Sequence, residues 1–257
     1  MQQVKAKKFL GQHFLKDQNI ARNIVASLTE VYPKGDVLEV GPGMGVLTQF
    51  LLAEPTLTVW AVEVDMESVS YLNIKFPQLS SRLLMKSFLD INFEEYFQSE
   101  FSVIGNFPYY LSSQIVFNII DNKIKVPFMV GMFQKEVAQR LCSLHGSKAY
   151  GILSVVTQAF YEVEYLFTVS ETVFDPPPKV KSAVVRFSRK NVPLGCDEKL
   201  FRTVVKVAFN QRRKKLRNSI SSYGLTDEQL AEYASKRAEE LSVNDFVNLT
   251  LLIASTR

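Results

Sequence analysis

The spacing of hydrophobic residues changes near residue 190. Before that point, short β-branched or apolar runs alternate with amphipathic segments, which predicts strands alternating with helices. Such alternation is typical of right-handed crossovers in a mostly parallel sheet. The expected strands are residues 36–40, 57–64, 82–85, 101–106, 127–133, 152–160, 164–169 and 182–188. The expected helices between the first five strands are residues 46–54, 66–76 and 112–121.

The last expected strands follow one another without an intervening helix, so the sheet should have an antiparallel edge. After these strands, the end of the chain shows only helical spacing. The predicted fold class is therefore α/β, with a sheet domain at residues 1–190 and a small all-α domain at residues 191–257. The helices expected in the second domain are residues 197–211, 212–224, 226–240 and 242–255. The residues suited to start or stop these helices are Asp197, Thr226, Ser242 and Gly224.

Composition limits the kind of protein. The chain has 257 residues and is 47% hydrophobic, enough to bury a substantial core. It contains no run of 18 apolar residues, and its start carries charges rather than an apolar signal region, so we expect a cytoplasmic protein without a membrane span. Cys142 and Cys196 lack the spacing of a metal site, and we expect two free thiols.

Positive charge is concentrated in the last third of the chain. Residues 182–257 hold 14 Lys and Arg and 8 Asp and Glu, a net charge of +6, whereas residues 1–181 carry −2. A solvated helix face is one explanation for a basic run. The absence of acidic partners four positions away favours a surface that binds nucleic-acid phosphates. The densest basic stretch contains Arg212, Arg213, Lys214, Lys215 and Arg217.

A glycine-rich loop follows the first expected strand. Gly41, Gly43 and Gly45 form a G-x-G-x-G pattern, in which the bare backbone lets a nucleotide-like ligand approach helix N–H groups. Val46 replaces the last glycine of the dinucleotide fingerprint and no P-loop lysine follows, which disfavours NAD and ATP. Glu63 ends the next strand, where a carboxylate can accept both ribose hydroxyls. An unrelated glycine turn and a surface glutamate form the alternative explanation.

A second motif, Asn-Phe-Pro-Tyr, follows the expected strand at residues 101–106. The Asn106 side-chain oxygen and the Phe107 carbonyl can accept both N–H groups of an aromatic amine, which directs its lone pair toward an incoming methyl group. Pro108 fixes the turn, and Tyr109 offers a flat face for a base. Taken alone, the motif is also typical of an ordinary turn. Its position beside the glycine loop favours methylation of an amino nitrogen.

Five separated motifs occur in one order along nearly the whole chain. They are KKFLGQHFL (7–15), LEVGPGMG (38–45) with EVD (63–65), IGNFPYY (104–110), VFDPPPKVKSAVVR (173–186) and FNQRRKKLRN (209–218). Together they resemble the KsgA-type ribosomal RNA small-subunit adenine dimethyltransferases. The resemblance implies a Rossmann-like S-adenosylmethionine-dependent methyltransferase sheet as the catalytic domain and a helical RNA-binding domain.

The resemblance also assigns roles to residues. The implied cofactor-binding residues are Gln12, His13, Leu15, Glu39, Gly41, Gly43, Gly45, Glu63, Val64, Ser87, Phe88 and Asn106. The implied catalytic residues are Asn106, Phe107, Pro108 and Tyr109, with Tyr109 and Phe174 stacking the target base. The implied RNA-binding residues are Arg212, Arg213, Lys214, Lys215 and Arg217, in a basic helix.

One position departs from the family pattern. The family usually carries an aspartate after the third strand, which accepts a hydrogen bond from the adenine amine of the cofactor. Ser87 stands there in this chain. A serine hydroxyl binds adenine without charge assistance, so we expect weaker cofactor binding. Asp90, three residues further on, is a poorer substitute.

The implied reaction transfers four methyl groups from S-adenosylmethionine to two adjacent adenosines near the 3′ end of 16S ribosomal RNA, without a metal, and releases S-adenosylhomocysteine. The implied partner is an immature 30S-type particle, and we expect a monomer. Two alternatives stay open: an Erm-type 23S rRNA adenine methyltransferase and a mainly non-catalytic ribosome-assembly factor. The later motifs favour the small-subunit reading, and the intact Asn-Phe-Pro-Tyr motif argues against lost catalysis.

Overall fold

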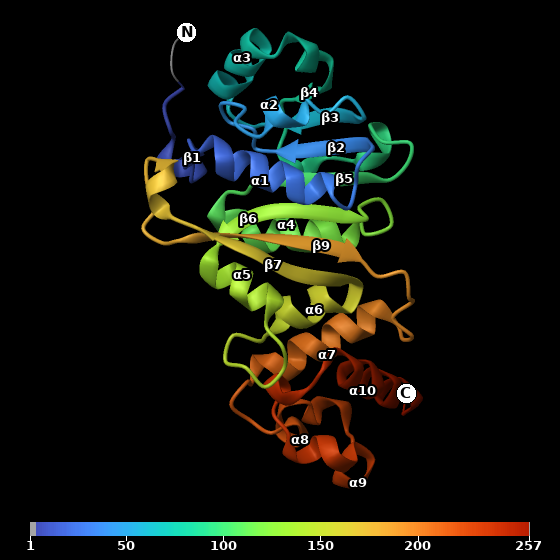
Figure 1. Cartoon of the computed structure of the whole chain (residues 1–257). Helices are drawn as coiled ribbons and strands as arrows, with labels where there is room; N and C mark the ends of the chain where they lie inside the picture. Colours follow the sequence, from blue (N-terminus) through green and yellow to red (C-terminus); the bar gives the residue numbers. More distant parts are fainter. Residues whose placement is uncertain (1–3, 257) are drawn as a thin grey trace. The chain divides into compact units, whose positions relative to one another are not determined.

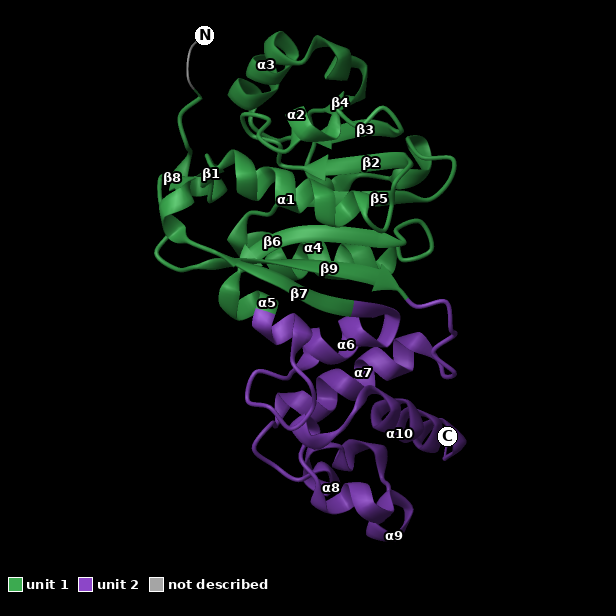
Figure 2. Cartoon of the chain, in the orientation of Figure 1, with its two compact units in different colours: residues 1–138, 163–189 green, residues 139–162, 190–257 purple. Residues whose placement is uncertain are grey.

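The computed structural model describes residues 4–256, and the chain divides into two compact units (Figures 1 and 2). Unit 1 contains the chain up to residue 138 together with residues 163–189, and unit 2 contains residues 139–162 and the segment from residue 190 onward. The sequence predicted a division at residue 190 and did not place residues 139–162 with the C-terminal segment.

Unit 1 is built on a seven-stranded sheet with the strand order β4-β3-β2-β5-β6-β9-β7. The strands are β2 (Gly35–Val40), β3 (Leu57–Val62), β4 (Leu83–Leu84), β5 (Phe101–Asn106), β6 (Phe128–Gln134), β7 (Tyr161–Val169), whose first two residues belong to unit 2, and β9 (Ser182–Arg189). Strands β4, β3, β2, β5 and β6 pair in parallel, whereas β9 runs antiparallel to β6. The predicted parallel sheet with an antiparallel edge is confirmed.

Helices cover both faces of this sheet, and Figure 1 shows α1 and α4 on opposite faces. The helices of unit 1 are α1 (Gln18–Thr29), α2 (Thr48–Leu51), α3 (Met66–Lys75), α4 (Ser112–Asp121) and the start of α5 (Lys135–Cys142). Asp17 begins α1 by accepting hydrogen bonds from the N–H groups of Asn19 and Ile20 at 2.8 and 3.0 Å. Burial of strands on both faces explains their continuous apolar runs.

A second, two-stranded sheet joins distant parts of the sequence. Strand β1 (Phe14–Leu15) runs antiparallel to β8 (Phe174–Asp175), with Leu15 opposite Phe174. The Lys16 N–H donates to the Val173 carbonyl at 2.8 Å and extends this pairing. The first and fourth sequence motifs are therefore neighbours in space.

Residues 152–160 form a helix, α6 (Ile152–Phe160), so the strand expected there is wrong. Its apolar and β-branched residues occur on all sides, and a run of this length does not distinguish a buried helix from a buried strand. The hydroxyls within it are satisfied in the helical form. Ser154 donates to the Arg140 carbonyl and Thr157 donates to the Leu153 carbonyl, both at 2.6 Å.

Unit 2 is helical, as predicted. Besides α6, its α-helices are α7 (Glu198–Asn210), α8 (Leu216–Ser219), α9 (Asp227–Leu230) and α10 (Val243–Ser255). The side chains of Asp197, Thr226 and Ser242 each accept a backbone N–H at the start of a helix, which confirms these three predictions. Gly224 ends a short turn of helix at φ 71°, as its type allows.

The basic stretch is not the continuous helix that the sequence predicted for residues 212–224. Helix α7 ends at Asn210, residues 211–214 form a turn, and α8 covers only Leu216–Ser219. Like charges three and four positions apart destabilise a helix, which disfavours a helix through Arg212, Arg213, Lys214 and Lys215.

Candidate active site

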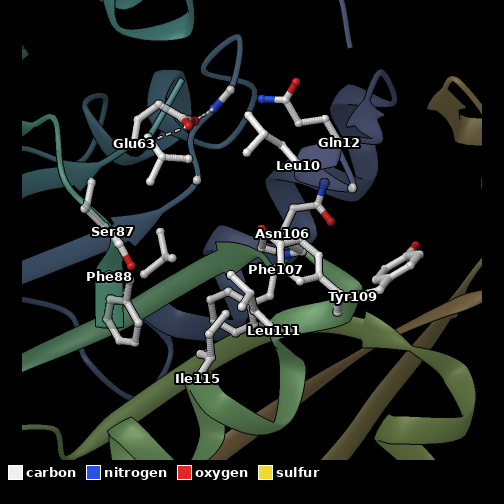
Figure 3. Close-up of a pocket in the computed structure, with 18 of the residues that line it drawn as sticks. Leu10, Gln12, Glu63, Ser87, Phe88, Asn106, Phe107, Tyr109, Leu111 and Ile115 are labelled. Carbon is white, nitrogen blue, oxygen red and sulfur yellow. Dashed lines mark hydrogen bonds between the residues drawn. The ribbon is translucent and has the colours of Figure 1, made fainter. Parts of the chain in front are cut away.

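The carboxyl ends of neighbouring parallel strands carry the predicted chemical motifs. Gly41 follows β2, Glu63 follows β3 and Asn106 ends β5. Because β2 lies between β3 and β5, the glycine loop is placed between Glu63 and Asn106. These residues border a cavity of about 320 Å³ within unit 1 (Figure 3). That volume is at the lower end of the range typical of small-molecule sites.

Most of the predicted site residues meet at this cavity. Those that line it are Gln12, His13, Gly41, Gly43, Glu63, Val64, Ser87, Phe88, Asn106, Phe107, Pro108 and Tyr109. Four predicted residues of the same unit do not line it, namely Leu15, Glu39, Gly45 and Phe174. The sequence missed several lining residues, chiefly Leu10, Lys86, Leu89, Tyr110, Leu111 and Ile115. Among these, Ile115 belongs to the apolar face of α4 and could have been found from its periodicity.

The three glycines of the loop serve two purposes. Gly41 and Gly43 have positive φ angles of 67° and 55° and border the cavity. A Cβ at Gly41 would meet nothing within 4 Å, so the bare backbone there leaves space for a ligand, whereas a Cβ at Gly43 would lie 2.9 Å from the Phe14 ring. Gly45 has φ 76°, and a Cβ there would lie 2.3 Å from the Phe76 ring. Gly45 therefore permits close packing against the residue after α3, which corrects its expected role in cofactor binding.

Glu63 is held by backbone donors. Its side chain is buried and accepts hydrogen bonds from the N–H groups of Gly43 at 3.1 Å, Val64 at 2.8 Å and Asp65 at 2.9 Å. Burial raises the pKa of Glu63, and the three backbone hydrogen bonds oppose that effect. A carboxylate offers about four acceptor positions. By this count Glu63 has room for one further donor. The sequence predicted that it would accept both ribose hydroxyls.

Glu39 lies beneath the glycine loop instead of in the main cavity. It borders a separate hollow of about 30 Å³ that also contacts Leu15 and Asn106. Its carboxyl is fully buried and accepts a hydrogen bond from the Thr48 hydroxyl at 2.6 Å. Burial, against the opposing hydrogen bond from Thr48 and with the added charge of nearby Glu63, raises the pKa of Glu39 to about 8. The group is therefore mainly protonated at neutral pH.

The Asn106 amide has a defined orientation. Its side-chain nitrogen donates to the His13 carbonyl at 3.0 Å, which leaves the side-chain oxygen as an acceptor (Figure 3). The Phe107 N–H donates to the Met132 carbonyl at 3.2 Å. In the described part of the chain, no donor reaches the Phe107 carbonyl. The two acceptors predicted from the motif are thus both available.

The buried Phe107 side chain anchors this loop to the sheet. It is 1% exposed and packs against Phe133, with ring centroids 5.1 Å apart. A Cβ at Gly131 would lie 2.2 Å from the Phe107 ring, and a Cβ at Gly105 would lie 2.7 Å from it. The sequence interpretation missed these two glycines in apolar strands, although a glycine inside a strand indicates close approach of another group.

The ring that faces Tyr109 is His13. The two ring centroids are 5.6 Å apart at an interplanar angle of 24°. The Tyr109 hydroxyl lies 2.6 Å from Ser182 Oγ, and His13 Nδ1 lies 2.7 Å from the Pro176 carbonyl, to which it donates. Burial raises the pKa of Tyr109, so its hydroxyl stays protonated near neutral pH.

Phe174 was expected to be the second stacking residue, and the structure corrects this. Its side chain is 1% exposed and belongs to the hydrophobic core of the sheet. Pairing of β8 with β1 turns the aromatic ring into that core and away from the cavity.

Ion pairs and a hydrogen bond hold the segment before β1 against the residues that follow β3. Lys7 forms ion pairs with Asp65 and with Glu67, the latter at 3.3 Å. The Gln12 side chain donates to Asp65 at 3.3 Å and accepts from the Lys7 N–H at 2.9 Å. This segment places Leu10 and Gln12 over the cavity, opposite Phe88 and Ile115 in Figure 3.

The far end of the cavity contains the position that departs from the family. Ser87 accepts a hydrogen bond from the Leu89 N–H at 3.2 Å and lines the cavity together with the largely buried Phe88. Asp90 is exposed and does not line the cavity, so it does not replace the missing carboxylate.

The basic residues in unit 2 differ in their pairing. Arg212 lies 3.5 Å from Glu239 and donates to the Lys148 carbonyl at 2.7 Å, and Arg217 pairs with Asp227 at 2.9 Å. The sequence, which showed no acid at helical spacing, did not predict these partners. Within residues 4–256, the exposed side chains of Arg213, Lys214 and Lys215 have no ion-pair partner.

Two kinds of feature are absent from residues 4–256. No helix there has the length and apolar character needed to cross a membrane, and no three His, Cys, Asp or Glu side chains are grouped in a way that could hold a metal. In the described part of the chain, neither Cys142 nor Cys196 forms a disulfide.

The strand order, the glycine loop with Glu63 and the loop after β5 define a class of protein, the Rossmann-like S-adenosylmethionine-dependent methyltransferases. The family model described as ribosomal RNA adenine dimethylase matches residues 3–255, and the chain belongs to this family.

Comparison with individual proteins agrees with that assignment. The chain is 57% identical to "Ribosomal RNA small subunit methyltransferase A" of Parabacteroides distasonis, over 98% of this chain and 95% of the relative. It is 50% identical to the protein of the same name from Cytophaga hutchinsonii, over 99% of both.

Solved structures support the fold. A dimethyladenosine transferase from Plasmodium falciparum superposes with a TM-score of 0.79 at 23% identity, covering 95% of this chain and 98% of that one. The 23S rRNA methyltransferase ErmE superposes with a TM-score of 0.71 at 23% identity, covering 94% and 99%. Both have this fold, so the fold alone does not identify the RNA substrate.

Proposed function

We propose that this chain dimethylates the exocyclic amines of two adjacent adenosines near the 3′ end of 16S ribosomal RNA, with S-adenosylmethionine as methyl donor. The observation that carries the proposal is the Asn106 amide, whose nitrogen is engaged by the His13 carbonyl so that its oxygen is left for a substrate amine. Full-length relatives named for the small subunit favour this substrate over that of an Erm-type enzyme.

The residues of the cavity fit the cofactor. Glu63 has room for a ribose hydroxyl, Val64 and Phe88 supply apolar surface for a flat base, and Gly41 leaves space along the loop. When bound, S-adenosylmethionine supplies an electrophilic methyl group.

The chain contributes orientation to the reaction. Asn106 Oδ1 and the Phe107 carbonyl accept the two N–H groups of the target amine and direct its lone pair toward the methyl group. S-adenosylmethionine held in the cavity would supply the methyl group to this nitrogen and would leave as S-adenosylhomocysteine. The methylated amine then loses a proton to water. Tyr109 stacks on the extruded base.

We further propose that the substrate is an immature 30S-type particle and that the protein acts as a monomer in the cytoplasm, without a metal. The exposed Arg213, Lys214 and Lys215 would bind phosphates of the ribosomal RNA. The alternative of a mainly non-catalytic assembly factor is disfavoured because the two acceptors of the Asn-Phe-Pro-Tyr loop are in place.

The test is transfer of labelled methyl groups from S-adenosylmethionine to purified, unmodified small subunits, followed by digestion to nucleosides and mapping. We expect dimethyladenosine at two adjacent positions near the 3′ end. The comparison is the same assay with purified large subunits, and transfer to their 23S rRNA instead would establish the Erm-type alternative. Binding to the subunit without any transfer would establish the assembly factor.

A further inference from the structure

A second hollow opens beside the active-site cavity. It is shallow and has a volume of about 510 Å³. Four of its lining residues also line the cavity, namely Gly11, His13, Tyr109 and Tyr110. Its remaining lining residues are Lys8, Phe9 and Gln134. All of these residues belong to unit 1. An RNA strand that inserts a base into the cavity past His13 and Tyr109 therefore crosses this hollow.

The hollow is unusual in its exposed aromatic surface. Phe9 is 79% exposed and Tyr110 is 58% exposed, although the burial of such rings normally contributes to stability. Gly11 has φ 59°, and a Cβ there would lie 3.1 Å from the Tyr110 ring. The bare Gly11 thus lets Tyr110 pack against the N-terminal segment while much of the ring stays open to solvent.

The charge of the hollow also points to a nucleic acid. Lys8 is exposed and has no ion-pair partner among the described residues. Gln134 supplies a half-buried amide, and no carboxylate lines the hollow. Aromatic faces beside an unpaired cation are the combination by which proteins bind single-stranded nucleic acids.

We propose that this hollow binds the nucleotide adjacent to the target adenosine, with its base stacked on Phe9 and Tyr110 and its phosphate near Lys8. The inference rests on the proposed function, since it requires a strand that carries two neighbouring adenosines. When the target base leaves the stack, the neighbouring base loses a stacking partner. An aromatic surface next to the cavity replaces that stacking contact.

The chemistry of the hollow suits a neighbour that changes during the reaction. A dimethylated adenine has lost both N–H donors but keeps its aromatic face. A subsite that recognised the amine would reject it, whereas stacking on Phe9 and Tyr110 accepts the adenine before and after methylation. The subsite therefore does not discriminate between the two methylation states of a neighbouring adenosine.

The decisive variant is Phe9→Ala, because Phe9 lines the hollow and not the cavity. We expect the KM for unmodified small subunits to rise about tenfold, the effect of losing one stacked base, while calorimetry shows unchanged affinity for S-adenosylmethionine. Phe9→Tyr, which keeps a flat ring, should restore the KM. Ile124→Ala is the matched control, since Ile124 is 78% exposed and lines neither the hollow nor the cavity.

A direct readout uses small subunits reconstituted with 2-aminopurine in place of the adenosine next to the target. Binding of the wild-type protein should quench its fluorescence, and Phe9→Ala should quench less. Equal KM and equal quenching for Phe9→Ala and Ile124→Ala would overturn the subsite. Failure of the wild-type protein to methylate adenosine would instead overturn the proposed function, so the two failures are distinguishable.

Discussion

The charged groups of the two units differ in how they are held. In unit 1, Glu39 and Glu63 are buried and hydrogen bonded to a hydroxyl or to backbone N–H groups. In unit 2, Arg213, Lys214 and Lys215 are exposed and unpaired within residues 4–256. Buried charges respond to protonation, whereas exposed charges respond to salt. We infer that methyl transfer depends on fixed geometry and RNA binding on charge density.

The largest expected effect tests the fixed geometry. Asn106→Ala removes the acceptor that orients the amine, and methyl transfer should fall by roughly 10²- to 10³-fold, as for loss of one preorganised hydrogen-bonding group. Single-turnover transfer to small subunits measures this effect, and calorimetry measures S-adenosylmethionine affinity, which should change little. Asn106→Asp keeps a side-chain oxygen for the target amine but loses the N–H group that donates to the His13 carbonyl. This variant therefore separates the contact with the amine from the contact with His13. Loss of cofactor binding in Asn106→Ala would contradict the assigned role.

The next effect concerns the exposed cations. Replacement of Arg213, Lys214 and Lys215 by glutamine should weaken binding to small subunits and reduce the slope of log affinity against log salt by about 2 to 3. Filter binding at several salt concentrations gives that slope. The matched control is Arg212→Gln with Arg217→Gln, because these two residues already pair with Glu239 and Asp227. If the triple substitution left the slope unchanged, this cluster would not contact the phosphates of the RNA.

A third test uses pH to address the buried charges. Burial raises the pKa of Glu39 to about 8 from 4.5, so the folded state holds this proton more tightly than the unfolded chain does. The stability that the proton contributes is complete below pH 4.5 and is lost as the pH rises through 8. Glu39→Gln keeps a partner for Thr48 without titrating. Between pH 6 and 8 the wild type should lose up to about 1.4 kcal/mol per pH unit relative to this variant.

Urea unfolding at a series of pH values measures that difference. The Arg213, Lys214 and Lys215 triple variant serves as the control, because these exposed residues belong to unit 2 and leave the buried carboxyl of Glu39 unchanged. Parallel pH profiles for the wild type and Glu39→Gln would show that Glu39 is ionised in the folded protein.

The smallest effect concerns the adenine end of the cavity. Ser87→Asp introduces a charged acceptor and should tighten S-adenosylmethionine binding about fivefold, the usual difference between neutral and charge-assisted hydrogen bonds. The aspartate can still accept the Leu89 N–H that Ser87 now binds, so the short helix start is retained. Calorimetry with Ser87→Ala as the comparison variant measures the change. Equal affinities for all three proteins would mean that this position does not contact the cofactor.

Much of unit 1 was predictable because its chemistry lies where strands end. Apolar runs that stop at Gly41, Glu63 and Asn106 identify strands, and parallel strands bring their carboxyl ends to one edge. Hydrophobic spacing does not give the order of the strands, and it could not show that β2 lies between β3 and β5. The strand order came from the structure.

Other features depend on contacts that spacing along the chain does not reveal. Phe174 is apolar and precedes a proline run, so its burial depends on the pairing of β8 with β1. The partners of Arg212 and Arg217 come from residues outside helical spacing. The Asn-Phe-Pro-Tyr motif was correctly placed, but His13 as the ring opposite Tyr109 required the fold.

The pairing of Leu15 with Phe174 also sets a condition on synthesis. At about 5–20 residues per second, a ribosome takes roughly 8 to 30 s to proceed from one of these residues to the other. Until then, the segment that places Leu10 and Gln12 over the cavity lacks its partner strand. A nascent chain therefore cannot complete its cofactor pocket before most of unit 1 has emerged, and the enzyme becomes competent late in its own translation.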